Sequence, residues 1–212
     1  SVWERLEQPA LLAPSPLQES LVAAGDLGRQ TGRGAYDHAA EPPPPVLGSA
    51  TAATPPAMHE ATGCAIALAA AAGADNVSLP LHHGDRLNFG ARHLEVRSTP
   101  GHTNGCLTFV LDDLSMAFTG DALLVRGCGR CDFQQGDAHT LWTSITEQIY
   151  SLPGACLLYP GHDYSGRNIT TVAEELAFNP RLGAAATERD FVGYMQNMKL
   201  PHPHRIAEAL PG

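Results

Sequence analysis

The chain has 212 residues, and its 13 Lys and Arg side chains against 22 Asp and Glu give a net charge of −9 at pH 7. This acidic balance argues against nucleic acid or an anionic membrane surface as the main partner, because both select clustered basic side chains. No apolar run approaches the roughly 20 residues that span a bilayer, and five cysteines are too sparse for a disulfide scaffold, which indicates a soluble intracellular protein with reduced thiols.

Residues 1–58 differ in composition from the rest of the chain. They hold nine of the 17 prolines, including four in succession at Pro42–Pro45, with Ala, Gly and Ser between them. Such a segment buries too little apolar area to offset the entropy of ordering it. We therefore expect residues 1–58 to be a poorly ordered low-complexity segment, and residues 59–212 to form one domain.

Beyond residue 58 the chain alternates between predicted helices and strands. An Ala-rich run predicts one helix over residues 59–73, which Gly73 ends. Alternation with period two predicts a strand over residues 92–97, followed by a hairpin of strands over residues 106–111 and 115–119. The later elements are a helix from Asp137 to about residue 151, a strand over residues 155–159, a helix that begins with a capping box at Thr171 and ends before Pro180, and a helix over residues 187–198. This interleaving predicts an α/β or α+β fold.

Three polar side chains come directly after predicted strands. His102 and His162 each follow a Pro-Gly pair, and Asp121 follows a glycine. The carboxyl ends of strands are where layered α/β folds bind ligands, and two imidazoles with one carboxylate suit zinc or ferrous iron. Each residue taken singly is equally compatible with a simple turn. The threefold repetition of the pattern favours a shared site.

The segments around these residues resemble the later metal-binding motifs of the metallo-β-lactamase superfamily. Their sequences are STPGHTNGC at residues 98–106, AFTGD at residues 117–121 and YPGHDY at residues 159–164. Within that superfamily, the segment VRGCGRCDFQQG at residues 125–136 resembles the persulfide dioxygenases, the sulfur dioxygenases of the ethylmalonic encephalopathy protein type. The match continues through three shorter segments, at residues 152–154, 179–182 and 197–201.

The resemblance implies an αββα sandwich that holds one ferrous iron, with zinc less favoured. Enzymes of this family oxidise glutathione persulfide with dioxygen to glutathione and sulfite in sulfide detoxification. By position, His102 and Asp121 would be iron ligands, and His162 matches a residue that binds a second ion in two-metal relatives. Arg130 and Tyr164 would hold the glutathione moiety, with Cys128 at the same site. No catalytic residue is expected beyond the metal ligands.

The chain departs from the family in one motif. The first metal motif of the superfamily, His-x-His-x-Asp-His, does not occur anywhere in the sequence. His59, which leads into the predicted helix, resembles only the tail of that motif and is the nearest candidate for a third ligand. The N-terminal half of the sandwich is therefore expected to be degenerate or incomplete.

Three functions remain open at this point. The first is a persulfide dioxygenase, and the second is a non-catalytic homologue or incomplete chain without a full metal site. The third is a thioester hydrolase of the glyoxalase II kind, which needs two metals. The expected partner is a thiol substrate such as glutathione persulfide, with a homodimer left open, and the expected location is the mitochondrial matrix if the chain is eukaryotic.

Overall fold

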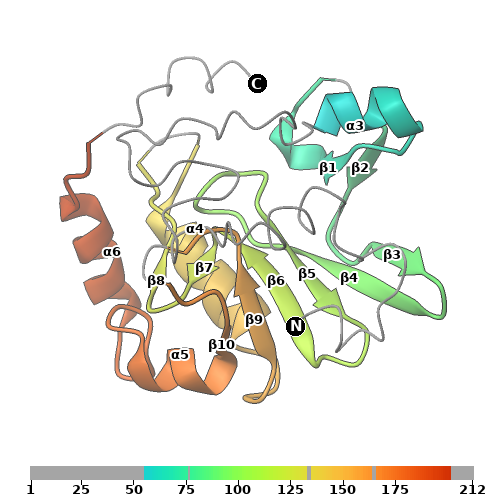
Figure 1. Cartoon of the computed structure of the whole chain (residues 1–212). Coiled ribbons are helices and arrows are strands. Elements are labelled where there is room, and N and C mark those ends of the chain that lie inside the picture. Colours follow the sequence, from blue (N-terminus) through green and yellow to red (C-terminus); the bar gives the residue numbers. More distant parts are fainter. Residues whose placement is uncertain (1–54, 76, 133–134, 164–165, 202–212) are drawn as a thin grey trace. The chain divides into compact units, whose positions relative to one another are not determined.

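The computed structural model describes residues 55–75, 77–132, 135–163 and 166–201 (Figure 1). The chain divides into two compact units, residues 1–66 and 67–212, and the described part of the first is helix α3 (Pro55–Thr62) with the turn that follows it. Most of the low-complexity segment lies outside the described residues. The expected boundary after residue 58 thus stays a prediction.

The second unit is built on a six-stranded sheet. Its spatial order is β10-β9-β6-β5-β4-β3. The strands are β3 (Arg86–Phe89), β4 (Arg92–Ser98), β5 (Leu107–Leu111), β6 (Met116–Gly120), β9 (Leu157–Pro160) and β10 (Thr170–Thr171). The predicted hairpin is confirmed, because Val110 of β5 pairs antiparallel with Ala117 of β6.

Strand directions decide which strand ends meet. β5 runs antiparallel to both β4 and β6, and β9 runs parallel to β6. Strands β4, β6 and β9 therefore point the same way, and their carboxyl ends lie at one edge of the sheet. These are the three strands that precede the polar residues singled out in the sequence.

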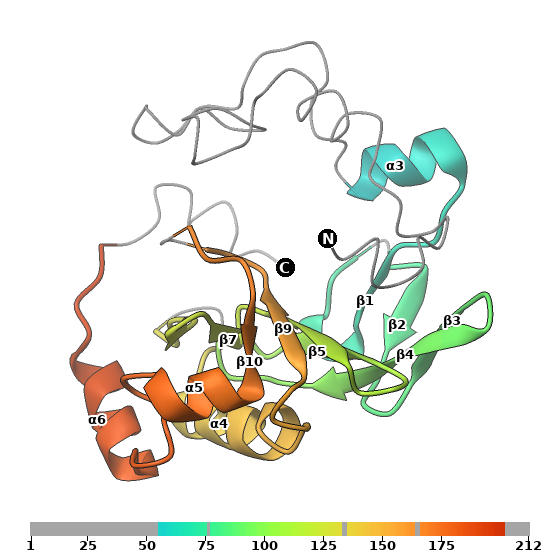
Figure 2. The same ribbon diagram turned by 60° about the horizontal axis from the view of Figure 1, so that its bottom comes forward.

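The helices of this unit lie on one face of the sheet (Figure 2). They are α4 (Ala138–Thr143), which continues as the π-helix η3 (Ser144–Ile149), then α5 (Val172–Phe178) and α6 (Glu188–Asn197). The caps expected at Asp137 and Thr171 are present, and Thr187 caps α6 in the same way, because each side chain accepts a backbone N–H three residues ahead. The buried faces of the helices meet the sheet in one apolar core, which includes Leu141, Ile145, Ile149, Leu158 and Phe191.

The expected single helix over residues 59–73 is wrong. Helix α3 ends at Thr62, because Gly63 takes a left-handed φ of 70° and its N–H closes on the His59 carbonyl. The Ala-rich run forms the strand β1 (Ala67–Ala69) and the short 3-10 helix η2 (Ala70–Ala72) instead. Alanine favours a helix only weakly, and here parallel pairing of β1 with β2 (Leu79–Leu81) overrides that preference. Gly73 does end the run, with φ of 62°.

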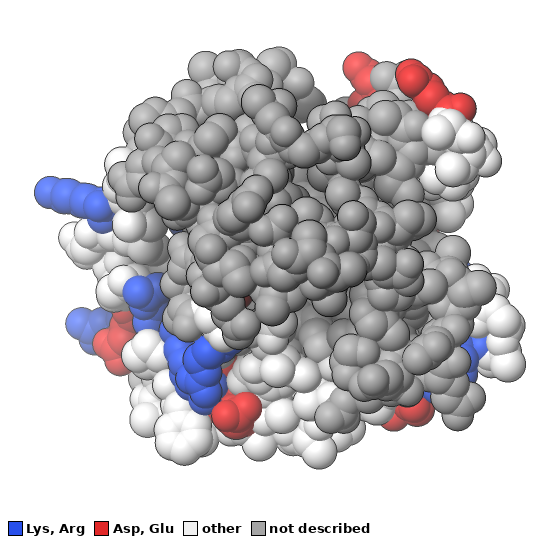
Figure 3. Space-filling view, viewed as in Figure 1, with Lys and Arg blue, Asp and Glu red and all other residues white. Residues whose placement is uncertain are grey.

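The remaining short strands, β7 (Leu123–Leu124) and β8 (Gly127–Cys128), form a small antiparallel ribbon after β6. On the face drawn in Figure 3, acidic and basic side chains of the described residues are interspersed, without a continuous basic patch. None of the described helices is both long and apolar enough to cross a membrane. The α+β class predicted from the sequence is confirmed.

Candidate metal centre

His102, Asp121 and His162 lie together at one edge of the sheet. Each follows one of the three strands that point the same way, β4, β6 and β9. Two of the loops are tied directly, since the N–H of Gly161 donates to the carbonyl of Gly120 at 2.7 Å. The prediction that these strand ends converge is therefore explained by the strand order.

The carboxylate of Asp121 stands between the two imidazoles. Its Oδ1 atom lies 2.6 Å from Nδ1 of His162, and its Oδ2 atom lies 3.7 Å from Nε2 of His102. The side chains of His102 and Asp121 are 18% and 24% exposed, whereas that of His162 is 60% exposed. The first two therefore form the sheltered part of the cluster, and His162 its open side.

A backbone carbonyl orients His102. Its Nδ1 atom lies 2.6 Å from the carbonyl oxygen of Arg130, which can only accept, so the proton resides on Nδ1. The lone pair is then on Nε2, the atom that faces Asp121. An imidazole fixed in this tautomer by a carbonyl is a ready metal ligand, because the acceptor sets both the ring orientation and the basicity of the other nitrogen.

The loop that carries Arg130 can approach His102 because it contains Gly129. The N–H of Gly129 donates to the Asp121 carbonyl at 2.8 Å. A Cβ atom on Gly129 would lie 2.4 Å from that carbonyl oxygen and 2.7 Å from Cγ of His102. No side chain fits there, so the glycine is required for the close approach.

Arg130 does not stand alone beside the cluster. Its guanidinium group pairs with the carboxylate of Asp132 and also donates to the backbone carbonyls of Leu200 and Pro201. The side chain is only 14% exposed. The role of Arg130 in holding a substrate stays a prediction, as does that of Tyr164, which lies outside the described residues.

Cys128 belongs to the core. It is 8% exposed in β8, and burial raises the pKa of its thiol to about 11. Burial likewise raises the pKa of Cys131 to about 12, with a smaller contribution from Cys128. Both residues are therefore neutral thiols at physiological pH, and the described cysteines form no disulfide. A substrate contact through Cys128 stays a prediction.

His59 lies in the first unit. Its side chain is exposed, and Nδ1 lies 2.7 Å from the Cys64 carbonyl oxygen. That contact uses one ring nitrogen within its own turn. Its candidacy as a third ligand stays a prediction.

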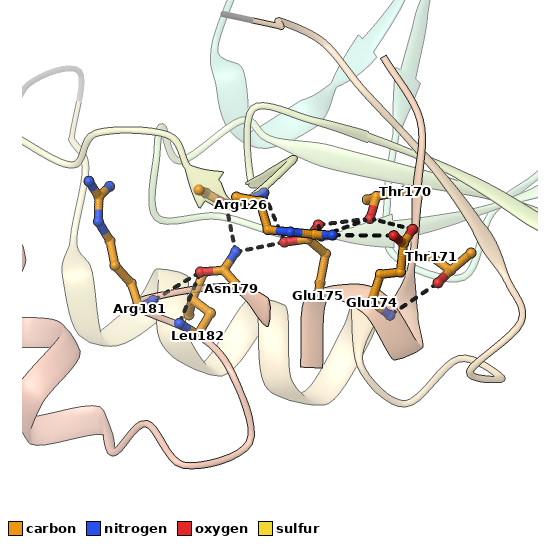
Figure 4. A network of polar contacts seen from close by, with 9 residues as sticks. Arg126, Thr170, Thr171, Glu174, Glu175, Asn179, Arg181 and Leu182 are labelled. Atoms are coloured by element: carbon orange, nitrogen blue, oxygen red, sulfur yellow. Dashed lines mark hydrogen bonds and ion pairs between the residues drawn. The ribbon is translucent and has the colours of Figure 1, made fainter. Parts of the chain in front are cut away.

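Sequence reasoning missed the polar network that holds the loop after β7 (Figure 4). The fully buried Glu175 pairs with the Arg126 guanidinium, accepts the Arg126 N–H at 3.0 Å, and accepts Nδ2 of Asn179 at 2.8 Å. Asn179 in turn donates to the Gly127 carbonyl at 3.3 Å. The segments at residues 125–136 and 179–182, both noted for their family resemblance, are thus joined through Glu175. No periodic pattern in the sequence marks that residue as buried.

The donor types at the site are those that suit ferrous iron or zinc. Their number falls short, however. Within the part of the chain that the structure describes, no group of three or more His, Cys, Asp or Glu side chains is arranged to hold a metal ion. The described residues therefore do not fit a complete metal site, although His102 and Asp121 present two suitable donors.

The family model described as the metallo-beta-lactamase superfamily matches residues 24–162. The mitochondrial persulfide dioxygenase ETHE1 of Mus musculus is 52% identical over 149 residues, and that of Homo sapiens is 53% identical, each match covering 70% of this chain. A hydroxyacylglutathione hydrolase of Fuscovulum blasticum is 35% identical over 161 residues.

Among solved structures, ETHE1 from Myxococcus xanthus superposes with a TM-score of 0.69 at 40% identity, covering 74% of this chain and 68% of that one. A metallo-beta-lactamase from Staphylococcus aureus superposes with a TM-score of 0.65 at 24% identity, which bears on the fold alone. The chain spans only 58% of the length of the mouse and human relatives. What those proteins do as wholes is therefore a hypothesis for this chain.

Proposed function

Because the chain belongs to the metallo-β-lactamase superfamily, whose membership implies a metal cofactor, we propose that it is an iron-dependent dioxygenase for glutathione persulfide. The observation that carries this proposal is the 52% identity over 149 residues to the mouse persulfide dioxygenase ETHE1. The match to a hydroxyacylglutathione hydrolase is weaker, at 35%. Thioester hydrolysis is therefore the less favoured activity.

In this proposal His102 and Asp121 are two of the iron ligands. The carbonyl of Arg130 holds the Nδ1 proton of His102, which leaves Nε2 as the donor. An iron bound there would supply the site for the reaction between persulfide sulfur and dioxygen. A third ligand has to come from elsewhere, since the described residues do not complete the set.

The Arg130 guanidinium is proposed to bind a carboxylate of the glutathione moiety. Arg and carboxylate match in planar two-bond geometry, which makes the pair selective as well as strong. Arg130 lies beside the metal centre through its own backbone, because its carbonyl accepts from His102 at 2.6 Å. Tyr164 and Cys128 are carried as further substrate contacts on the family resemblance alone.

A non-catalytic homologue is the second candidate. It is favoured by one observation, the lack of a three-donor group among the described residues. Two side chains with water in the remaining positions hold an ion much more weakly than a full set of ligands, because each lost donor lowers the affinity. The same fold without bound metal would keep the loop that carries Arg130 but would not oxidise a persulfide.

The two candidates differ in iron content and oxygen consumption. Iron per chain would be measured on the purified protein, and oxygen uptake with glutathione persulfide would be followed with and without added ferrous iron. We expect less than one iron per chain and slow uptake that rises with added iron, and the Asp121→Ala variant should abolish that rise. Absence of uptake at excess ferrous iron would reject the dioxygenase, and hydrolysis of S-lactoylglutathione would favour the hydrolase.

The mouse and human relatives are named as mitochondrial proteins. We therefore propose the mitochondrial matrix as the location if the chain is eukaryotic. Fractionation of cells that express the full-length gene product would test it, with matrix recovery expected and a purely cytosolic pool arguing against it.

A further inference from the structure

The guanidinium group of Arg130 is engaged on two of its sides. Its side-on pair of donors, Nε and Nη2, bonds the carboxylate of Asp132, with Nε lying 2.6 Å from Oδ1. A guanidinium has a second pair of donors at its end, Nη1 and Nη2, which can also donate hydrogen bonds to two acceptors at once. The Asp132 carboxylate leaves this end-on pair directed at other partners.

Backbone carbonyls occupy the end-on pair. Nη1 lies 2.9 Å from the Pro201 carbonyl oxygen, and Nη2 lies 3.4 Å from that of Leu200. The first contact is an ordinary hydrogen bond and the second is long, but together they take up the pair of donors that would otherwise be open to a carboxylate. The backbone of residues 200–201 thus occupies the place of the ligand for which such a group is best suited.

We propose that residues 199–201, here called the strap, are an autoinhibitory segment that occupies the carboxylate subsite of Arg130 and is displaced when a substrate carboxylate binds. This rests on the proposed function in one respect, the assignment of a glutathione carboxylate to Arg130. The exchange is favourable because a charged acceptor bonds a guanidinium more strongly than a neutral carbonyl does.

Little side-chain packing holds the strap in place. All three of its residues are exposed, and the Leu200 side chain is 48% exposed, so little apolar burial opposes its release. The segment follows α6, which stays anchored by Phe191, Val192 and Met195 in the core. Release can therefore be confined to the residues beyond that helix.

The exchange does not require movement of the metal centre. The side chain of Arg130 holds the strap, whereas its backbone carbonyl accepts from His102. Asp132 can retain the guanidinium through the side-on pair while the end-on pair changes partner. A carboxylate can thereby bind the guanidinium without loss of the hydrogen bond between the Arg130 carbonyl and the His102 imidazole.

The sequence offers a direct probe, because Lys199 is the only lysine in the chain. Endoproteinase Lys-C can cut the protein only after this residue, within the strap. The probe ligand is reduced glutathione, and glutathione diethyl ester, which lacks both carboxylates, is its matched control. The cleavage rate would be followed by intact-mass spectrometry on the full-length chain, without metal or turnover.

We expect glutathione to speed the cleavage and the diester to leave it unchanged. If glutathione binds only the open form, the ratio of open to closed strap rises about tenfold at ten times the dissociation constant of that form, and the cleavage rate follows the open population. Binding of glutathione would be measured by calorimetry on the same protein. Binding without faster cleavage, or no binding at all, would overturn the proposal.

Two variants test independently whether Arg130 holds the strap. Arg130→Gln removes both donor pairs and adds no lysine, so we expect fast cleavage that glutathione no longer affects. Arg86→Gln makes the same change at an exposed position of the edge strand β3 and should behave as the parent chain. Circular dichroism would establish that both variants are folded, and a parental rate in a folded Arg130→Gln protein would refute the strap.

The strap tests and the test of dioxygenase activity can give opposite results. An iron-free, inactive protein whose strap opens with glutathione would keep the inference and reject the dioxygenase. An active iron enzyme whose strap ignores glutathione would do the reverse.

Discussion

Nδ1 of His162 lies 2.6 Å from Oδ1 of Asp121, although 41 residues separate the two along the chain. The contact exists because β6 and β9 are parallel neighbours whose ends, Gly120 and Pro160, lie in register. It leaves the other oxygen of Asp121 facing His102. One carboxylate therefore links all three strand ends, and the loops that bring them close should be intolerant of added atoms.

Gly129→Ala tests that intolerance. The new Cβ would meet the Asp121 carbonyl at 2.4 Å and the His102 ring at 2.7 Å, and backbone cannot move aside as a flexible side chain would. We expect a loss of about 1–3 kcal/mol in the free energy of unfolding, the usual cost of overpacking. Urea denaturation followed by circular dichroism would measure it.

Gly193→Ala is the matched control. Gly193 lies inside α6, and nothing stands within 4 Å of its added Cβ. Alanine there should raise the free energy of unfolding by about 0.5–1 kcal/mol, because glycine costs more backbone entropy in a helix. Equal effects of the two changes would show that the Gly129 loop relaxes freely.

Sequence reasoning was reliable where the chain repeats a local rule. Strand alternation, the caps at Asp137 and Thr171, and the residues that follow strands were all placed correctly. Each depends on neighbours a few residues away, so the sequence carries the information. His102 was selected in this way, as a residue after a strand and a Pro-Gly breaker.

Sequence reasoning failed where partners are distant. The run at residues 67–72 has the composition of a helix, but Asn104 donates to the Ala71 carbonyl at 2.9 Å, and Leu79–Leu81 supplies a parallel strand. The Arg130 contact with Pro201 spans 71 residues and uses a backbone carbonyl, which no side-chain pattern reveals. Such contacts are set by the tertiary fold, which overrides local preference.

Glu175→Gln tests the network of Figure 4. Glu175 is fully buried and pairs with Arg126, whose side chain is 22% exposed. Glutamine keeps the shape but leaves the arginine charge without its buried partner, so we expect a loss of about 3–5 kcal/mol in the free energy of unfolding. Chemical denaturation at neutral pH would measure it.

The neighbouring Glu174 provides the control. It also pairs with Arg126, at 3.2 Å, but its side chain is 43% exposed and solvent screens the pair. Glu174→Gln should cost less than about 1 kcal/mol. Adding Arg126→Met to Glu175→Gln should recover part of the loss, since no unpaired charge then remains buried. A double variant less stable than Glu175→Gln would contradict this account.

Asp137 should stabilise α4 in a pH-dependent way. Its hydrogen bonds with Thr140, first from the side chain and then from the backbone N–H, lower its pKa below the ordinary value of 3.8. The folded state thus binds this proton less readily than the unfolded state. The stabilisation is present above about pH 4 and is lost as the pH falls through the lowered pKa.

The matched substitution is Asp137→Asn, because asparagine also caps helices but does not titrate. The difference in unfolding free energy between the parent chain and this variant should change below pH 4 and stay constant above it. Asp137→Ala should cost about 1 kcal/mol at neutral pH. A parent-to-Asn difference that is flat from pH 2 to pH 7 would show that the cap charge has no role.

The buried thiol of Cys128 should weaken the fold at high pH. Burial raises its pKa from 9.0 to about 11, so between these values the unfolded chain ionises while the folded chain keeps the proton. The unfolded state then binds fewer protons, and the free energy of unfolding falls as the pH rises from about 9 to about 11. Cys128→Ala should make this decline shallower without abolishing it, because burial also raises the pKa values of Cys131 and Cys156. The lost sulfur should lower stability at neutral pH.

Exposed Cys64 provides a control for the burial of Cys128. Iodoacetamide at pH 8 should modify Cys64 in the native protein and reach Cys128 and Cys156 only after unfolding, since both are buried and have pKa values raised to about 11. Mass mapping of the labelled peptides would decide it, and rapid native labelling of Cys128 would place β8 outside the closed core.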